Sequence, residues 1–217
     1  MQTSTVDATV ESLTEIKAEL EAAALAGYND ISDPHYAAAG FTALQHSEAI
    51  LSPENARWKR ESARNLLDSG YSLASTASLV GVSNRTVAAW SSSDPTPRHV
   101  VPLGDLTPVD DAANHVGVAM LIPALAGLGR ALGSITDEAA KDNPAKSAAI
   151  TLLAVASPSP IYNYHLARAL AGLHLRGATL ETLARGVGRS TSWVKARIAS
   201  TGASHWVEAE REKRNTP

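Results

Sequence analysis

The chain has no cysteine and only one phenylalanine among its 217 residues. It can therefore form no disulfide bond and no thiolate metal site, which fits a reducing compartment. Aromatic residues make up 5% of the sequence, so the hydrophobic fraction of 44% is mainly aliphatic, with much alanine. Because alanine is the best helix former, this composition predicts a helical protein with few strands.

The sequence also has no hydrophobic run long enough to cross a bilayer. The longest uncharged apolar run, 116–129, falls short of the roughly 20 residues that a spanning helix needs, and we expect it to be a buried core helix. The first 30 residues are acidic and polar rather than basic and then apolar, so we expect no signal peptide. These absences predict a cytoplasmic protein without a membrane partner.

Motifs for catalysis and metal binding are missing too. Gly127, Gly129 and Gly133 have the wrong spacing for a dinucleotide loop, and small residues there favour close helix packing instead. Asp111 and His115 lie one helical turn apart without a third ligand nearby. No serine occurs in a nucleophile motif, and no carboxylate cluster suggests a nuclease. We expect no enzymatic activity, no metal and no cofactor.

The net charge of −3 is unevenly distributed along the chain. Residues 1–51 carry one base and eight acids, a net charge of −7, and residues 93–158 carry four bases and seven acids, a net charge of −3. Residues 52–92 carry five bases and three acids, and residues 159–199 carry six bases and one acid, giving +2 and +5. An acidic chain with two basic islands has local surfaces that attract phosphate.

The two basic islands are related in sequence. Residues 73–92 align with residues 180–199 without a gap, at an offset of 107 (180 minus 73). The identities at this offset include Ala77 with Ala184, Gly81 with Gly188, Ser83 with Ser190, Val87 with Val194, Gly70 with Gly177, and Ser52-Pro53 with Ser159-Pro160.

The repeated residues are those that two crossing helices with a tight turn require. Alanine allows the second helix to cross the first, glycine accepts a positive φ in the turn, and serine caps the second helix. The valine points back toward the first helix. Flanking apolar residues complete the expected cores: Leu73, Val80, Val82 and Trp90 in the first copy, and Leu180, Leu183 and Val187 in the second.

This pattern resembles the helix-turn-helix family found in resolvases, transposases and bacterial repressors, in two tandem copies. The resemblance covers residues 52–92 and 159–199. The second copy departs from the family pattern at Arg189, where an apolar residue often occurs, and this side chain is expected to face solvent or phosphate instead. A pair of helical bundles that do not bind DNA is the alternative.

The expected fold is all-α, with two similar helical subdomains that each end in a helix-turn-helix and are joined by a Pro-rich linker. The first domain spans 1–92 with its helix-turn-helix at 73–92, and the linker is 93–108. The second domain spans 109–202 with its helix-turn-helix at 180–199, and 203–217 is a tail. Further helices are expected at 7–26, 34–50, 53–68, 109–132, 139–156 and 160–175.

The resemblance implies that the second helix of each unit enters the major groove with its first residues against base edges. Arg85 has the geometry to read guanine and Asn84 to read adenine. Arg189 and Arg197 suit phosphates better. The remaining base-edge candidates are Ser83 and Thr86 in the first copy, and Ser190, Thr191, Ser192 and Lys195 in the second.

Further basic residues are candidates for contacts with the DNA backbone: Arg57, Lys59, Arg60, Arg64 and Arg168. Ordinary solvated charge is the alternative for each of them. Arg98 in the linker has the chemistry to enter a minor groove between the two sites, and the alternative is a plain linker residue.

The sequence thus predicts site-specific binding of double-stranded DNA at an asymmetric bipartite site, by a transcriptional repressor of a bacterium, phage or plasmid. A partition, packaging or recombination accessory protein is the alternative within DNA binding. A helical protein–protein adaptor is the alternative from another class. The N-terminal helix or the helix at 109–132 offers a surface for a homodimer.

Overall fold

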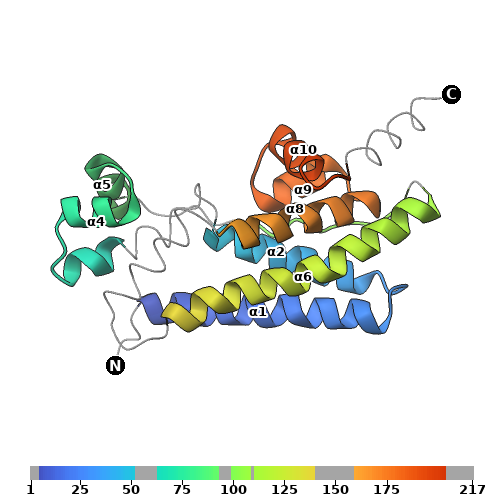
Figure 1. Cartoon of the computed structure of the whole chain (residues 1–217), viewed down its shortest axis with the longest axis horizontal. Coiled ribbons are helices and arrows are strands. Elements are labelled where there is room, and N and C mark those ends of the chain that lie inside the picture. Colours follow the sequence, from blue (N-terminus) through green and yellow to red (C-terminus); the bar gives the residue numbers. More distant parts are fainter. Residues whose placement is uncertain (1–4, 52–62, 93–98, 109, 140–158, 204–217) are drawn as a thin grey trace. The chain divides into compact units, whose positions relative to one another are not determined.

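The computed structural model describes residues 5–51, 63–92, 99–108, 110–139 and 159–203. These residues contain helices and irregular segments, such as 99–108, and no strand (Figure 1). The predicted all-α class is confirmed for these residues. Residues 63–68 are also helical. The helices are α1 (Thr5–Asn29), α2 (His35–Leu51), α4 (Leu73–Val80), α5 (Asn84–Ser92), α6 (Asp111–Ala139), α8 (Pro160–Leu175), α9 (Leu180–Val187) and α10 (Thr191–Ala199).

Helix α6 continues past the end predicted at residue 132, because Gly133 does not terminate it. The helix penalty of a glycine is about 1 kcal/mol relative to alanine. Leu132 and Thr136 are buried on either side of Gly133, and the Thr136 hydroxyl donates to the Gly133 carbonyl at 3.0 Å. Burial of these residues outweighs the local propensity. The helix predicted at 139–156 and the tail at 203–217 lie almost wholly outside the described residues.

Helix α6 is the one helix in the described ranges that is long and apolar enough, by length and composition alone, to cross a membrane. The core helix of a soluble protein meets the same test, and 67% of the apolar window of α6 is buried within the protein. Leu121, Leu125 and Leu128 are fully buried. This burial agrees with the core helix predicted at 116–129.

The chain divides into two compact units, each drawn from three stretches of sequence. The first unit comprises Met1–Lys17, His46–Arg98 and Arg130–Ser159, and the second comprises Ala18–Gln45, His99–Gly129 and Pro160–Pro217. The units are therefore interleaved along the chain, whereas the division predicted from the sequence is consecutive. The consecutive division into 1–92, 93–108 and 109–202 stays a prediction about the two repeats and the segment between them.

The second half of the predicted linker is anchored within the second unit. The buried Gln45 side chain donates to the Val101 carbonyl at 2.8 Å and accepts from the Val101 N–H at 2.7 Å. A buried amide needs such partners, because an unpaired one costs about 1–3 kcal/mol. The backbone of Thr107 also lies directly against Gly177. Residues 99–108 are thus held in place rather than spanning freely between domains.

Glycines set the close helix contacts of the second unit. In α6 and α8, a side chain added at Gly172 would place its Cβ 2.7 Å from the Gly117 carbonyl oxygen and 2.8 Å from the Leu121 nitrogen. Gly127 packs against the ring of His165, as expected of a small residue at a helix crossing. These contacts bring α6 against α8, and the helix pair that follows α8 is built on them.

Gly172→Ala is therefore expected to destabilise the protein by about 3 kcal/mol, because the added methyl group meets rigid backbone rather than a flexible side chain. Thermal or urea unfolding measures the change. Gly133→Ala is the matched control, since the nearest atoms to its Cβ belong to the flexible Lys17 side chain at 3.2 Å. The control should be neutral or gain up to about 1 kcal/mol of helix stability. Equal effects of the two variants would contradict the close crossing.

Candidate nucleic-acid interface

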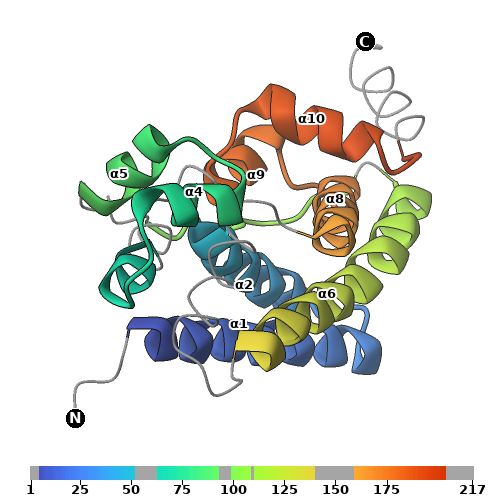
Figure 2. The same cartoon turned by 60° about the vertical axis from the view of Figure 1, so that its left-hand side comes forward.

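Both segments predicted as helix-turn-helix units form two short helices joined by a three-residue turn (Figure 2). We call α4 and α5 the first helix pair, and α9 and α10 the second helix pair. Adding 107 to the bounds of α4, Leu73–Val80, gives those of α9, Leu180–Val187. The same addition takes α5, Asn84–Ser92, to α10, Thr191–Ala199. The two pairs have the same lengths and the same turn.

The turn between the helices has the same backbone conformation in both pairs. Gly81 has φ 71° and ψ 33°, and Gly188 has φ 65° and ψ 39°, so both lie in the left-handed region. This confirms the positive φ predicted at the two glycines. A residue with a Cβ would cost roughly 1–2 kcal/mol there.

The helix caps also match. The predicted caps are confirmed: Ser83 Oγ accepts from the Thr86 N–H at 3.1 Å, and Ser190 Oγ accepts from the Trp193 N–H at 3.2 Å. Ser72 and Thr179 cap the first helix of each pair in the same way, at 3.0 and 3.1 Å. Sequence reasoning missed these two caps, although a hydroxyl residue directly before an apolar helix signals them.

Backbone hydrogen bonds around the turns repeat at the same offset. The Val82 N–H donates to the Ala77 carbonyl at 3.0 Å, and the Arg189 N–H donates to the Ala184 carbonyl at 2.9 Å. The Tyr71 N–H donates to the Leu66 carbonyl and, correspondingly, the Ala178 N–H donates to the Leu173 carbonyl, both at 3.0 Å. The Val87 N–H donates to the Ser83 carbonyl at 3.2 Å, and the Val194 N–H donates to the Ser190 carbonyl at 3.1 Å.

The cores of the two pairs differ in size. Ala77 and Val87 of the first pair form a small buried cluster with Ala63 of the preceding helical segment, and Val82 packs against it. Leu73 was predicted to join this core, but it is 40% exposed, so that prediction is wrong. In the second pair the buried residues are Leu183, Ala184, Gly186, Val187, Val194 and Ile198.

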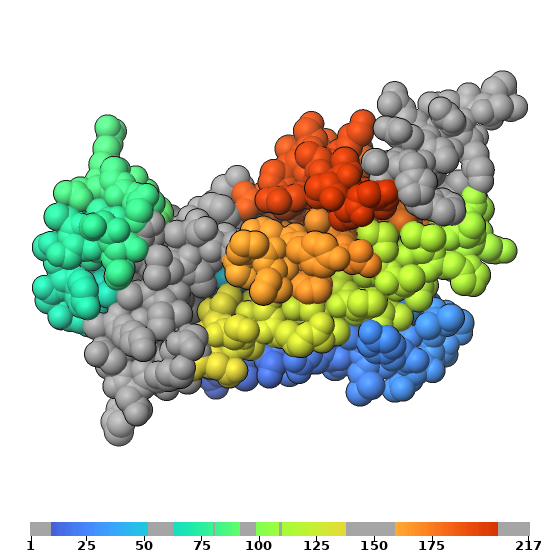
Figure 3. All heavy atoms as spheres, viewed as in Figure 1, coloured from blue at the N-terminus to red at the C-terminus, as the bar shows by residue number. Residues whose placement is uncertain are grey.

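One substitution between the repeats explains part of this difference. Gly186 of α9 lies directly against the Phe41 ring of α2, within the second unit. Leu79 occupies the equivalent position of α4 and is 40% exposed. Without a Cβ at residue 186, α9 can pack against α2 and share its core. The second helix pair is thus part of a larger core, and Figure 3 shows α8, α9 and α10 as one continuous surface.

The start of α5 presents two unengaged side chains with base-reading chemistry. Asn84 and Arg85 are exposed, and their side chains form no hydrogen bond with any residue that the structure describes. Ser83 is different, because its hydroxyl caps α5 and also lies 2.8 Å from the Thr86 hydroxyl. Asn84 and Arg85 are therefore the stronger of the predicted base-edge candidates in the first pair.

The start of α10 presents shorter polar groups. Thr191, Ser192 and Lys195 are exposed, as base-edge candidates should be. Ser190 acts as the helix cap. A hydroxyl group contacts several bases, and an ammonium group can donate to both acceptors of guanine but lacks the fixed planar fork of a guanidinium.

Two of the predicted phosphate contacts lie beside a tryptophan. The guanidinium carbon of Arg189 is 5.2 Å from the Trp193 ring centroid, and that of Arg197 is 4.9 Å from it. All three side chains are half-buried. Sequence reasoning missed Trp193, although its position one helical turn from each arginine was a usable signal. We call these three residues the Trp193 cluster.

The other predicted backbone contacts divide into three groups. Arg64 braces the first helix pair, because its Nε and Nη2 donate to the Ser91 carbonyl at 3.0 and 2.8 Å. Arg168 lies over the Tyr164 ring at 5.7 Å. The remaining candidates fall outside the described residues: Arg57, Lys59, Arg60 and Arg98.

One base of the second island is unavailable to DNA. Arg176 is 6% exposed, and its guanidinium carbon lies 4.6 Å from the centroid of the Tyr36 ring. Burial raises the pKa of the Tyr36 hydroxyl above its ordinary value, and the nearby Arg176 charge partly opposes this. The outward charge of residues 159–199 is thus +4 rather than +5, since one of six bases is buried.

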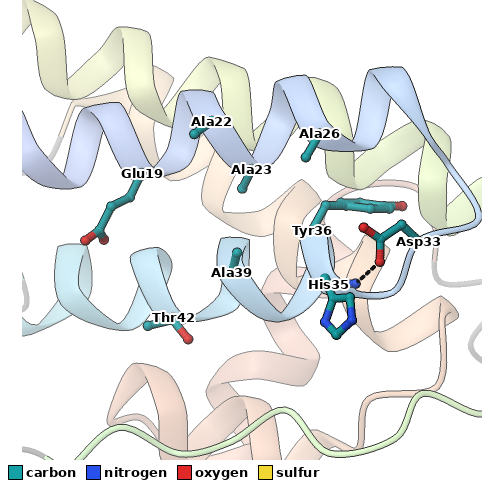
Figure 4. Close-up of a pocket in the computed structure, with 9 residues that line it drawn as sticks. All are labelled: Glu19, Ala22, Ala23, Ala26, Asp33, His35, Tyr36, Ala39 and Thr42. Carbon is teal, nitrogen blue, oxygen red and sulfur yellow. Dashed lines mark hydrogen bonds between the residues drawn. The ribbon is translucent and has the colours of Figure 1, made fainter.

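A shallow pocket of about 490 Å³ lies between α1 and α2, within the second unit (Figure 4). Ala22, Ala23 and Ala26 of α1 face Ala39 of α2, and these small side chains leave the space open. Sequence reasoning did not predict this pocket. Asp111 and His115, the pair that lies one helical turn apart in the sequence, are both in α6 and away from this pocket. A ring nitrogen of His115 lies 2.6 Å from the backbone oxygen of Asp111.

Comparison of the chain with protein-family models, curated proteins and solved structures finds no match. What the molecule does must therefore be inferred from its own geometry and charge.

Proposed function

We propose that the chain binds double-stranded DNA at specific sites through two helix-turn-helix units, one formed by each helix pair. The observation that carries the proposal is the repeated geometry: helix bounds, turn glycines, caps and backbone hydrogen bonds recur at one offset of 107 residues. Each pair belongs to a basic island of an otherwise acidic chain. Two helix pairs with the same turn, on two cationic segments, suit two contacts with one polyanion.

The exposed start of each second helix supports contact with a groove. A helix fits into the major groove of B-DNA, and its N-terminus favours nearby phosphate through its dipole and unpaired N–H groups. Asn84 and Arg85 lie at this end of α5, and Thr191 and Ser192 lie at this end of α10. None of these four side chains is buried.

The DNA site is expected to be asymmetric. At the exposed positions of the two second helices, Asn84 is replaced by Thr191, Arg85 by Ser192 and Ala88 by Lys195. Helices with different side chains prefer different bases, so one chain does not require a palindrome. A bipartite site read by one chain is the simplest arrangement.

Transcriptional repression is the use we propose for this binding, since the chain carries two DNA-binding units and no proposed catalytic centre. Partition, packaging or recombination is the alternative, and long arrays of the target would favour it.

The exposed Leu25 and Tyr28 on α1, at 60% and 61%, give some support to a homodimer or to a protein adaptor. A target selected from random DNA sequences, with the footprint mapped, tests the main proposal.

Arg85→Ala is expected to cost about 1–3 kcal/mol on the best site and to relax the preference at one base pair. The reason is loss of a two-point contact to guanine. Lys59→Ala is the control, because a phosphate contact should weaken binding to all sequences about equally. Competition binding against a set of single-base variants measures both. If Arg85→Ala weakens specific and random DNA by the same factor, Arg85 contacts only the backbone.

A further inference from the structure

The exposed groups at the two second helices differ in kind as well as in identity. Helix α5 offers an amide and a guanidinium, Asn84 and Arg85, both exposed and without a hydrogen bond to the described part of the chain. Helix α10 offers two hydroxyls and one ammonium group at Thr191, Ser192 and Lys195. Amide and guanidinium groups discriminate bases by planar bidentate contacts, whereas a hydroxyl contacts several bases and an ammonium group donates without a fixed plane.

The second helix pair has a feature that the first pair lacks. At the offset of 107, the Trp193 cluster corresponds to Val82, Thr86 and Trp90, which include no cation. Val82 is packed against the core of the first pair. The replacement of Val82 by Arg189 therefore converts a core position into a cationic one.

The Trp193 cluster occupies one flank of α10 and the turn before it. Val194 and Ile198 are buried, and Ser192 and Lys195 are exposed, so half-buried Trp193 and Arg197 lie between the buried and exposed faces. When a helix enters the major groove, its tip meets the bases and its flanks meet the phosphate backbones. The guanidinium carbons of Arg189 and Arg197 lie 5.2 and 4.9 Å from the Trp193 ring centroid, and a side chain restricted in this way loses less freedom when it contacts a phosphate.

We infer that the two helix pairs divide the work of recognition: α5 selects the DNA sequence through Asn84 and Arg85, and the second helix pair supplies sequence-independent affinity through Arg189 of its turn and Arg197 of α10, which Trp193 positions. This inference rests on the proposed DNA-binding function. It makes one half of the bipartite site strongly defined in sequence and the other half tolerant of substitution.

The test uses the full chain, its best selected duplex and a random duplex, with affinity measured over a range of salt concentrations. Arg197→Ala is expected to lower affinity for both duplexes by the same factor, about tenfold, and to reduce the slope of log affinity against log salt by about 1. Arg85→Ala should lower the ratio of specific to random affinity about tenfold or more and leave random binding almost unchanged. A change of that ratio by Arg197→Ala, or none by Arg85→Ala, overturns the inference.

The role of Trp193 has its own variants. Trp193→Phe keeps a ring for stacking and should retain most of the affinity, while Trp193→Leu should lower affinity for both duplexes about equally, by about tenfold. Circular dichroism checks that α9 and α10 remain folded, and Arg189→Ala gives the same test with Trp193 intact. Equal affinity of Trp193→Leu and the unaltered chain would remove Trp193 from the proposal. If the unaltered chain binds no duplex at low salt, the proposed function itself has failed.

Discussion

Raising the salt concentration from 50 to 200 mM is expected to lower the affinity of this protein for duplex DNA by about 10³ or more. A protein that neutralises phosphates releases the cations condensed on them, and about 6–10 phosphate contacts give a loss of this size. The two basic islands contain eleven bases, five in residues 52–92 and six in residues 159–199, of which Arg176 is buried. Ten bases remain for such contacts.

The same experiment separates the candidate functions. Because the whole chain has a net charge of −3, attraction to DNA has to come from the local basic surfaces. A protein adaptor that uses the apolar residues of α1 has no reason to bind duplex DNA at 50 mM salt. Absence of binding at low salt, or an affinity that does not change between the two salt concentrations, would contradict the DNA-binding proposal and favour the adaptor.

Much of the local geometry of the helix pairs could be predicted from the sequence. The positive φ of Gly81 and Gly188 and the helix caps at Ser83 and Ser190 depend only on the local backbone and on neighbouring residues. A short sequence pattern is therefore sufficient to predict them. The all-α class followed from composition in the same way. These properties depend on residues a few positions apart in the chain.

Properties that depend on distant contacts could not be predicted in this way. Leu73 looked like a core residue, but in the first helix pair nothing described covers it enough to bury it. Gln45 fixes Val101 from 56 residues away, so a proline-rich segment that looked like a free linker is partly anchored. The Phe41 contact with Gly186 likewise depends on the tertiary fold.

The candidate site shows the same limit. Exposure of Asn84 and Arg85 follows from their positions at the start of an amphipathic helix. The brace from Arg64 to the Ser91 carbonyl requires knowing how two helices cross, and no local pattern encodes it. Trp193 lies between these cases, because its spacing to two arginines was visible but its role depends on the half-buried flank of α10.

One chain is expected to bind one bipartite site far more tightly than either helix pair could alone. Once one unit is bound, contact by the second is intramolecular, and the gain in affinity from such linkage is about 10²–10⁴. Arg85→Glu places a carboxylate against DNA in the first pair, and Lys195→Glu does so in the second. Each change alone should therefore lower affinity for the full site by about 10²–10⁴. The double variant should bind the full site no more tightly than it binds random DNA.

Point variants suit this test better than separated halves do. A cut between Ser92 and His99 would remove residues 130–159 from the first unit and residues 18–45 from the second, so loss of binding would also reflect loss of fold. Asp105→Lys, which alters charge at an exposed position outside both helix pairs, controls for long-range electrostatics and should leave the full-site preference unchanged.

Stoichiometry by native mass spectrometry completes the test, with one chain per site expected. If Lys195→Glu leaves the affinity unchanged, or if the selected site is a perfect palindrome occupied by two chains, the tandem arrangement is wrong. A dimer would then replace it, with α5 of each chain reading one half-site about 34 Å from the other and the second helix pair serving the fold. The larger core of the second helix pair, which includes Val194 and Ile198, would suit that structural role.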